Sequence, residues 1–120
     1  MNTDNLRDLN QFTGSECFYT NPIGKMRYSE GVRFLAENAN CYWLIDAIAS
    51  YQPKLLKIET FQYLQFWELA VHPNRSCELL CREDSNIEPA VRQEIEYTDF
   101  PLPEIKLWVE YGMLILPSEH

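Results

Sequence analysis

The chain has 120 residues and a formal net charge of −8, with 46% hydrophobic and 23% charged residues. This length suits one domain with a substantial core, and the apolar content excludes a disordered or low-complexity chain. The acidic balance argues against binding to nucleic acid or to an anionic membrane surface, since both need clustered cations.

The first residues predict a short helix. Leu6, Leu9 and Phe12 fall at helical spacing, so we expect an amphipathic helix over residues 4–12. The segment has neither the basic start nor the apolar run of a secretory signal, and no stretch of the chain is apolar enough to span a membrane. We therefore expect a cytoplasmic protein with reduced thiols at its four cysteines, which are Cys17, Cys41, Cys77 and Cys81.

Two short extended segments are expected next. Residues 16–19 and 25–28 read as extended, on either side of a turn at Asn21-Pro22 and Gly24. Proline fixes φ and glycine accepts positive φ, and both properties are typical of turns.

Two helices are expected to follow. Ser29 is a favourable N-cap, and Glu30 would lie in the first turn, where the helix dipole favours an acid. Residues 41–51 are apolar almost all round, which predicts a central core helix that Pro53 ends. Residues 54–62 are ambiguous, and a short helical turn suits them best.

From Tyr63 onward, the apolar residues recur every second position, which predicts strands. Residues 63–71 and 77–82 alternate in this way, and residues 72–76 between them read as a hairpin loop. Residues 91–98 alternate most cleanly and predict a half-exposed strand of an antiparallel sheet.

The C-terminal residues leave one element open. Residues 104–110 fit a short helix slightly better than one arm of a hairpin that turns at Tyr111-Gly112, and residues 113–116 read as a last strand. Helices come first and strands follow, which predicts a single α+β domain over residues 1–120. In it, an antiparallel sheet is packed on one face by the 41–51 helix, with short helices at the N-terminus.

Asp46 is the only charged residue between Glu37 and Lys54, and it lies in the most apolar helix. A buried carboxylate must be paired, hydrogen-bonded, protonated or exposed in a cleft. One interpretation is a general base or binding carboxylate in an aromatic-lined cleft; the other is a structural anchor held by backbone N–H groups, a hydroxyl or an arginine. The candidate binding residues of the first interpretation are Asp46, Tyr19, Tyr28, Trp43, Tyr97 and Asp99.

Known catalytic and metal-binding patterns are missing from the sequence. Cys77 and Cys81 would lie on one strand face, but a structural zinc site needs a second pair of ligands, and none is present at suitable spacing. No nucleophile elbow, phosphate loop or dinucleotide fingerprint occurs. We expect no metal and no cofactor, and an enzyme is the less favoured interpretation.

Residues 83–104 carry six of the eight net negative charges. They form either a solvated surface that keeps the chain dispersed or a docking surface for a basic partner. The candidate residues of that acidic face are Glu88, Glu94 and Glu96. The leading hypothesis is a non-catalytic protein-interaction domain with an unidentified protein partner; a homodimer and an acidic mimic of nucleic acid stay open. The alternative is a small ligand-binding domain or enzyme that uses Asp46.

Several segments, taken in order, resemble a small bacterial family of unknown function. They are FTGSE (12–16), Tyr28–Glu37, YWLIDAIAS (42–50), Phe66-Trp67, YTDF (97–100) and LPSE (116–119). The resemblance covers nearly the whole chain and implies a single bacterial domain with no assigned activity. It also implies two departures: relatives tend to carry Arg-His where this chain has Thr20-Asn21, and often His where it has Tyr51. A histidine-based site of the family could therefore not operate here.

Overall fold

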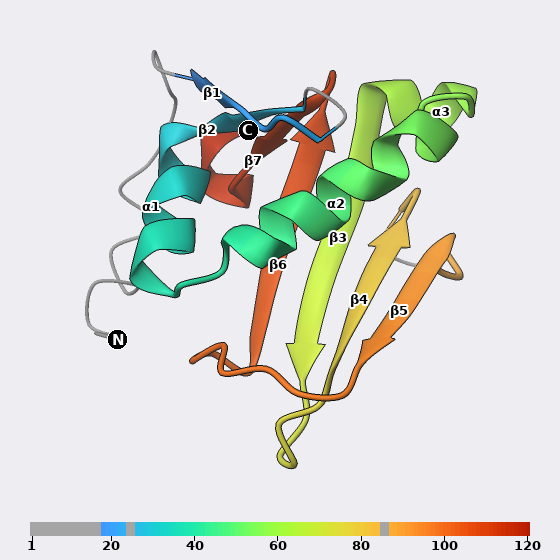
Figure 1. Ribbon diagram of the computed structural model, residues 1–120. Helices are drawn as coiled ribbons and strands as arrows, with labels where there is room; N and C mark the ends of the chain where they lie inside the picture. Colours follow the sequence, from blue (N-terminus) through green and yellow to red (C-terminus); the bar gives the residue numbers. More distant parts are fainter. Residues whose placement is uncertain (1–17, 24–25, 85–86) are drawn as a thin grey trace.

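The structure is a computed structural model that describes residues 18–23, 26–84 and 87–120. Its elements in chain order are β1 (Phe18–Thr20), β2 (Arg27–Ser29), α1 (Glu30–Asn38), α2 (Tyr42–Leu55), α3 (Glu59–Tyr63), β3 (Leu64–Val71), β4 (Cys77–Arg82), β5 (Val91–Ile95), β6 (Glu104–Glu110), β7 (Met113–Ile115) and a 3₁₀ turn (Pro117–Glu119) (Figure 1). No helix in these ranges is long and apolar enough to cross a membrane. The helix predicted over residues 4–12 lies outside the described residues, as do Cys17 and Gly24.

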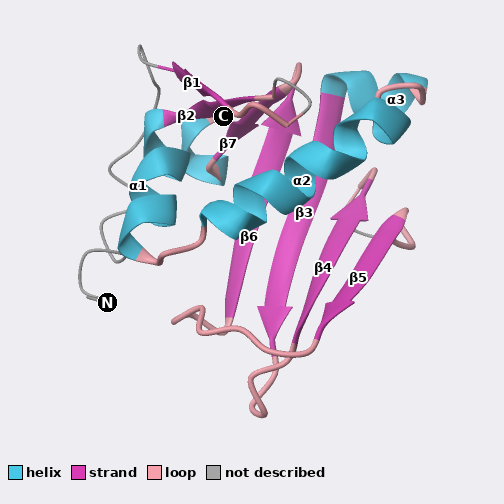
Figure 2. Ribbon diagram, in the orientation of Figure 1, coloured by secondary structure: helices cyan, strands magenta, loops and turns pink. Residues whose placement is uncertain are grey.

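The described strands form one mixed sheet in the order β1-β2-β7-β6-β3-β4-β5. Five neighbouring pairs are antiparallel, and β2 pairs with β7 in parallel. The predicted α+β class is confirmed, but the purely antiparallel sheet is wrong at this pair. Most of the domain separates β2 from β7 in the chain, so no tight turn imposes an antiparallel arrangement on them. The helices lie on one face of the sheet, and α2 runs diagonally in front of β6 and β3 (Figure 2).

Helix α1 begins where the sequence predicts. The hydroxyl of Ser29 accepts a hydrogen bond of 3.2 Å from the Val32 N–H, and Glu30 lies in the first turn. This cap satisfies one of the amide groups that a helix N-terminus leaves without an intrahelical partner. The apolar side of α1, which includes Leu35, packs into the core and is buried.

Helix α2 is longer than predicted, and it is buried on one side only. It continues through Pro53 to Leu55, although proline removes a backbone donor and the sequence predicts that it ends the helix. Leu55 is 5% exposed, and its burial offsets part of the cost of the proline. Asp46 and Ser50 are exposed, so α2 has one buried side rather than being apolar all round.

The hairpin between β3 and β4 follows its prediction. Val71 lies opposite Cys77, and the His72 N–H donates to the Ser76 carbonyl at 2.8 Å, which closes a short loop. Arg75 has a φ of 72° in this loop, and its guanidinium donates to the Phe100 carbonyl at 2.6 Å. The hairpin is thereby tied to the segment that follows β5.

Residues 104–110 form strand β6, so the helix favoured for them is wrong and the hairpin alternative is correct. Leu107 and Val109 are buried and alternate with more exposed neighbours, as expected for a strand. The turn to β7 has positive φ at Tyr111 (50°) and Gly112 (79°), which suits the twist of a two-residue hairpin loop.

A buried amide network joins α2 to β3. The side chains of Gln52 and Gln65 donate to each other's carbonyl oxygens at 2.9 Å, and both are almost fully buried. The Trp67 indole N–H donates to the Gln65 carbonyl oxygen at 2.8 Å, and the Gln65 amide also donates to the Phe61 carbonyl at 3.1 Å. The network satisfies polar groups inside the core, where an unpaired group would be costly.

A second set of hydrogen bonds joins the C-terminal segment, residues 116–119, to the start of α1. The Ser29 hydroxyl donates to a Glu119 carboxylate oxygen at 2.6 Å, and the same oxygen accepts from the Leu116 N–H at 2.9 Å. A Cβ atom at Gly31 would lie 2.8 Å from both Glu119 Oε1 and Leu116 Cδ1. Glycine is therefore required at this contact because a side chain would push the C-terminal segment away.

Candidate functional site

Strand β5 forms one edge of the described sheet. It pairs with β4 through Val91–Ile95, and no strand within residues 18–23, 26–84 and 87–120 pairs with its other side. An edge strand presents unpaired N–H and C=O groups and can act as a template for another chain. The sheet position of β5 makes its outer side the first candidate surface.

Hydrogen bonds elsewhere in the sheet show which groups of β5 face outward. The Val71 N–H donates to the Pro103 carbonyl and the His72 N–H to the Ser76 carbonyl, both at 2.8 Å. In an antiparallel ladder such bonds alternate along each strand. Carrying the alternation through β4 places the outward backbone groups of β5 at Arg92 and Glu94. Among the described residues, the edge therefore offers two positions whose backbone donors and acceptors have no partner strand.

The side chains of β5 divide between the two faces of the sheet. Val91 is buried, and Gln93 accepts a hydrogen bond of 2.8 Å from the Tyr51 hydroxyl of α2, so the odd positions face the helices. The even positions face the other side of the sheet, on which no described helix lies (the uncovered face), and there the Arg92 guanidinium lies 3.3 Å from the Glu78 carboxylate. Both sets of side chains flank the free backbone edge.

A first hollow lies between the C-terminal part of α2 and the start of β5. It encloses about 360 Å³ and is lined by Tyr51, Lys54, Leu55, Ile58, Ala90, Val91 and Arg92. The Ile58 side chain is 46% exposed, although it is large and apolar. Lys54 gives the hollow its positive charge, and Arg92 borders it at the start of β5, although its guanidinium pairs with Glu78 on the other face of the sheet. This end of the β5 edge therefore combines apolar surface with positive charge.

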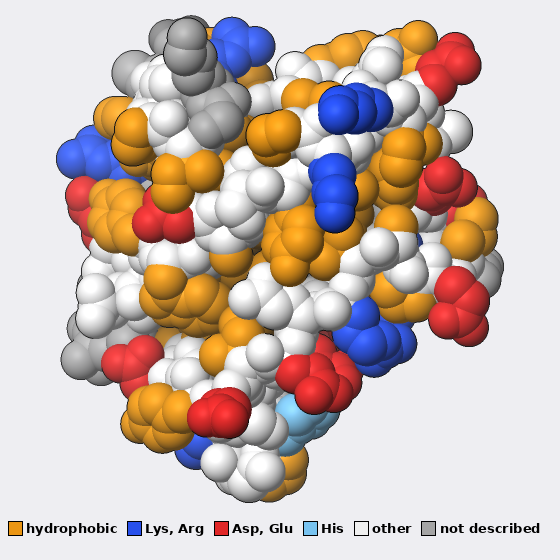
Figure 3. Space-filling model, turned by 45° about the vertical axis from the view of Figure 1, so that its right-hand side comes forward, with side chains coloured by type: hydrophobic (Ala, Val, Ile, Leu, Met, Phe, Trp, Pro, Cys, Tyr) orange, Lys and Arg blue, Asp and Glu red, His pale blue; other side chains and the backbone are white. Residues whose placement is uncertain are grey.

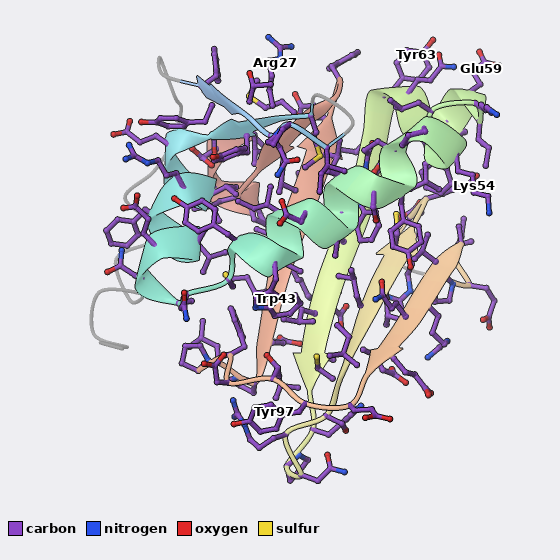
Figure 4. All side chains as sticks on the ribbon, in the orientation of Figure 1. Arg27, Trp43, Lys54, Glu59, Tyr63 and Tyr97 are labelled. Carbon is purple, nitrogen blue, oxygen red and sulfur yellow. The ribbon has the colours of Figure 1, made fainter. Side chains whose placement is uncertain are left out.

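A second hollow lies between the N-terminal part of α2 and the end of β5. It encloses about 310 Å³ and is lined by Trp43, Ile95, Tyr97, Thr98 and Asp99. Figure 4 shows Trp43 extending from α2 toward the end of the sheet where Tyr97 lies, while Lys54 lies at the opposite end of α2. Tyr97 is 69% exposed. Burial, with a contribution from the negative charge of Asp99, raises the pKa of the Cys41 thiol to about 12.

A third hollow, of about 370 Å³, adjoins the second at Ile95. Its polar lining includes His72, Glu78, Glu94 and Glu96. Glu78 and Glu94 are direct cross-strand partners, and like charges in that position are destabilising. In the space-filling view, hydrophobic side chains gather near the centre, and acidic side chains lie beside the histidine below them (Figure 3). The two ends of the β5 edge therefore differ in charge.

The uncovered face of the sheet has a separate aromatic hollow of about 370 Å³. Phe66 of β3 and Trp108 of β6 line it and meet edge to face, with ring centroids 5.2 Å apart. The His120 ring lies 4.8 Å from the Trp108 ring, and His120 also pairs with Glu110. Lys106 lines the same hollow, on the far side of β3 and β4 from β5.

The structure brings together some of the predicted binding residues. Trp43, Tyr97 and Asp99 line one hollow. Tyr19 and Tyr28 stack on each other at 5.6 Å, away from this hollow, and the Arg33 guanidinium donates to the Tyr19 hydroxyl at 2.7 Å. That hydrogen bond and the charge of a neighbouring glutamate raise the pKa of Arg33.

Asp46 occupies a different place from Trp43, although both lie on α2. Its carboxylate accepts a hydrogen bond of 2.8 Å from the amide of Asn21, which is 5% exposed. The Asn21 side-chain carbonyl in turn accepts from the Ile23 N–H at 2.7 Å. Asp46 thereby holds the chain just after β1 against α2, through an amide that was not among the predicted partners.

The three predicted acidic residues lie at different parts of the β5 segment. Glu94 is within β5 and Glu96 follows it, and both line the third hollow. Glu88 is exposed and precedes the strand, at its other end. Glu94 and Glu96 are therefore the members of the predicted acidic set that flank the free edge together.

The described residues of this surface form neither a metal site nor a reactive thiol. In the described ranges, no group of three or more His, Cys, Asp or Glu residues is placed to hold a metal ion. Cys41, Cys77 and Cys81 are free and buried. Burial raises the pKa of each, to about 12 for Cys41 and Cys81. The surface offers main-chain pairing, apolar contact and charge to a partner.

Two important features of the site escaped sequence reasoning. The first is the edge position of β5, which depends on the order of all the strands. The second is the pair Lys54 and Ile58, which the sequence places in an ambiguous stretch after Pro53. An isoleucine in a charged stretch is the signal that could have drawn attention to this surface.

The chain belongs to DUF6876, a family of unknown function, whose model matches residues 3–120. This confirms the resemblance to a family of unknown function. No curated protein and no solved structure is similar enough to match the chain. The family brings no activity with it, so the function of the chain has to follow from the geometry of the surface.

Proposed function

We propose that this chain is a protein-interaction domain that binds an extended segment of a partner protein by strand addition to β5. The observation that carries the proposal is the free edge of β5, with a hollow at each end between the strand and α2. In strand addition, main-chain hydrogen bonds provide affinity and neighbouring pockets for alternate side chains provide specificity.

The surroundings of the edge support this mode of binding. Ile58 and Tyr97 are 46% and 69% exposed, so apolar surface is available at both ends of the strand. Aromatic residues such as Tyr97 and Trp43 are enriched in protein interfaces because they bury large areas. The hydrogen bond from Tyr51 to Gln93 holds α2 and β5 together between the two hollows.

Charge adds a preference to the proposed surface. Lys54 and Arg92 lie at the start of β5, whereas Glu94, Glu96 and Asp99 lie at its end. Two of the three acidic residues predicted as a docking face, Glu94 and Glu96, thus lie at one end of the edge, where they favour a basic residue of the partner. Opposite charges across an interface favour one orientation of the bound segment.

The test uses peptides selected on the wild-type protein from a random phage library, with binding measured by fluorescence anisotropy. Glu94→Pro removes an outward N–H donor of β5 and should weaken binding at least about tenfold. Glu94→Gln keeps that donor and removes only the carboxylate charge, so it should lose much less affinity than Glu94→Pro. Equal binding of the selected peptides to wild type and Glu94→Pro would contradict strand addition.

A second pair of variants covers the case in which proline disturbs the fold. Ile58→Glu places a charge in the first hollow at an exposed position and should weaken peptide binding. Leu56→Glu is the matched control, because Leu56 is also exposed (37%) but is not part of the hollow's lining. Circular dichroism should show unchanged secondary structure for both. Equal loss of binding in the two variants would count against a role for the hollow.

A further inference from the structure

We infer that the strand that adds to β5 is β5 of a second copy of this chain, so that two copies form a two-fold dimer with one continuous sheet. The inference rests on the proposed function, from which it takes strand addition at this edge. It goes further by naming the partner, and the sequence of β5 itself carries the argument.

The charges of β5 are complementary to themselves when the strand is turned around. In an antiparallel pair centred on Gln93, the outward backbone groups of Arg92 lie opposite those of Glu94 in the second copy. The two-fold axis repeats the same pair on the other side. Both side chains lie on the uncovered face of the sheet. Each copy would therefore place a cation beside Glu94, which within one chain lies opposite another carboxylate, Glu78.

The other face of the strand is complementary in the same register. Val91 lies opposite Ile95 of the second copy, and Gln93 lies opposite Gln93. Cross-strand pairs of β-branched residues stabilise a sheet, and two glutamine amides can exchange hydrogen bonds. Both faces of β5 therefore favour the same centre of symmetry.

Other registers of the two paired β5 strands are less favourable, because they place like charges opposite each other. Only Arg92 and Glu94 have outward backbone groups in this strand, so pairing must match these positions with each other or with themselves. A shift in one direction sets Glu94 opposite Glu94, and a shift in the other sets Arg92 opposite Arg92. Like charges directly opposite each other are destabilising, so the charge pattern selects one register.

The residues around the strand follow the same symmetry. Lys54 lies near the start of β5 and Tyr97 near its end (Figure 4). Ile58 lines the same hollow as Lys54, and Asp99 the same hollow as Tyr97. Antiparallel pairing brings the start of one β5 beside the end of the other. The basic, apolar end of each copy then approaches the acidic, aromatic end of the second copy. Two-fold dimers bury such matching patches twice.

The experiment measures subunit count by native mass spectrometry and size-exclusion chromatography with light scattering. The wild-type chain should run at twice its mass of 14.2 kDa. Arg92→Glu and Glu94→Arg each place like charges opposite one another at both pairs of the dimer. Each should weaken self-association at least about tenfold. Lys106→Glu makes the same charge change on the same face of the sheet, away from β5, and should leave the dimer intact.

Two rescue measurements make the test specific. Mixing Arg92→Glu with Glu94→Arg pairs acidic positions with basic ones, so the mixture should form a heterodimer. The double variant Arg92→Glu/Glu94→Arg restores complementarity within one sequence and should again form a homodimer. If β5 instead bound a different protein, neither the mixture nor the double variant would restore binding, because the sequence of that protein is unchanged.

The outcomes separate this inference from the proposed function. A monomeric wild-type chain, or folded single variants that form no heterodimer when mixed, would overturn the two-fold dimer. If Glu94→Pro still abolished the binding of selected peptides in that case, strand addition at β5 would stand with another protein as partner. If wild type and Glu94→Pro bound these peptides equally and were both monomeric, both proposals would fall.

Discussion

Replacing Gln65 by leucine should strip two buried side-chain groups of their hydrogen-bond partners and should also remove the bond of 3.1 Å that its amide donates to the Phe61 carbonyl. The Trp67 indole N–H and the side-chain carbonyl of Gln52 each bond to Gln65 and to no other described residue. The Gln52 amide would keep its bond of 3.2 Å to the Ile48 carbonyl. The perturbation is therefore well defined, with two orphaned side-chain groups and one lost bond to a backbone carbonyl in a fully buried place.

The expected cost follows from this count. A buried polar group left without a partner costs about 1–3 kcal/mol, and the lost bond to the Phe61 carbonyl adds about 1 kcal/mol, so Gln65→Leu should lower the free energy of unfolding by about 3–7 kcal/mol. Gln52→Leu leaves both polar atoms of the Gln65 side chain with one partner each, in Trp67 and Phe61, and should cost about 1 kcal/mol. The double variant leaves the Trp67 N–H unpaired and also lacks the bond to the Phe61 carbonyl, at about 2–4 kcal/mol in all.

The assay is equilibrium unfolding in urea, followed by tryptophan fluorescence at one protein concentration. The double variant should be more stable than Gln65→Leu alone, although it contains one more substitution. Gln62→Leu, at an exposed glutamine, serves as the control and should change stability by less than about 0.5 kcal/mol. Additive effects of the two core substitutions, or a loss below about 1 kcal/mol for Gln65→Leu, would refute the reasoning.

Three further predictions concern the contact of the C-terminal segment with α1, the role of Asp46, and the buried thiols. Gly31→Ala adds a Cβ into the contact with the C-terminal segment and should lower stability by about 1–3 kcal/mol in thermal unfolding; an unchanged melting temperature would show that the segment yields freely. Asp46→Ala should cost about 1 kcal/mol through its bond to Asn21, with Asp46→Asn closer to wild type, and neither should alter peptide binding; lost binding with intact stability would instead mark Asp46 as a binding residue. Burial raises the pKa of the Cys41 and Cys81 thiols from 9.0 to about 12. At pH 8, their alkylation by iodoacetamide should therefore be up to about 1000-fold slower in the folded chain than in urea, as measured by peptide mapping. Equal rates in the two states would contradict the burial of the thiols. Because the unfolded thiols ionise first, stability should also fall as the pH rises from about 9 toward 12.

Local chemistry made several elements predictable from the sequence. Ser29 caps α1 through its own hydroxyl, and this contact spans only three residues. The hairpin around His72 joins two alternating segments through a short loop, so its register depends on neighbouring residues. Capping and short hairpins can be read from a sequence because each involves a few consecutive positions.

Other features depended on contacts between distant segments. Residues 104–110 contain apolar positions that suit either a helix or a strand, and pairing with β3 selected the strand. Helix α2 passes Pro53 because the last turn buries Leu55 in the core. For Asp46, the sequence indicated an unusual carboxylate but could not identify Asn21, which is 25 residues away, as its partner.

The candidate site shows the same division. The order of residues in β5 alone determines that it is self-complementary, since Arg92, Gln93 and Glu94 follow one another directly along the chain. Its place at the edge of the sheet, and the meeting of Trp43 with Tyr97 and Asp99, are decided only by the folded structure. The order of the strands, and which side chains meet, depend on which distant segments pack together. That packing is decided by the free energy of the whole core and not by any one segment.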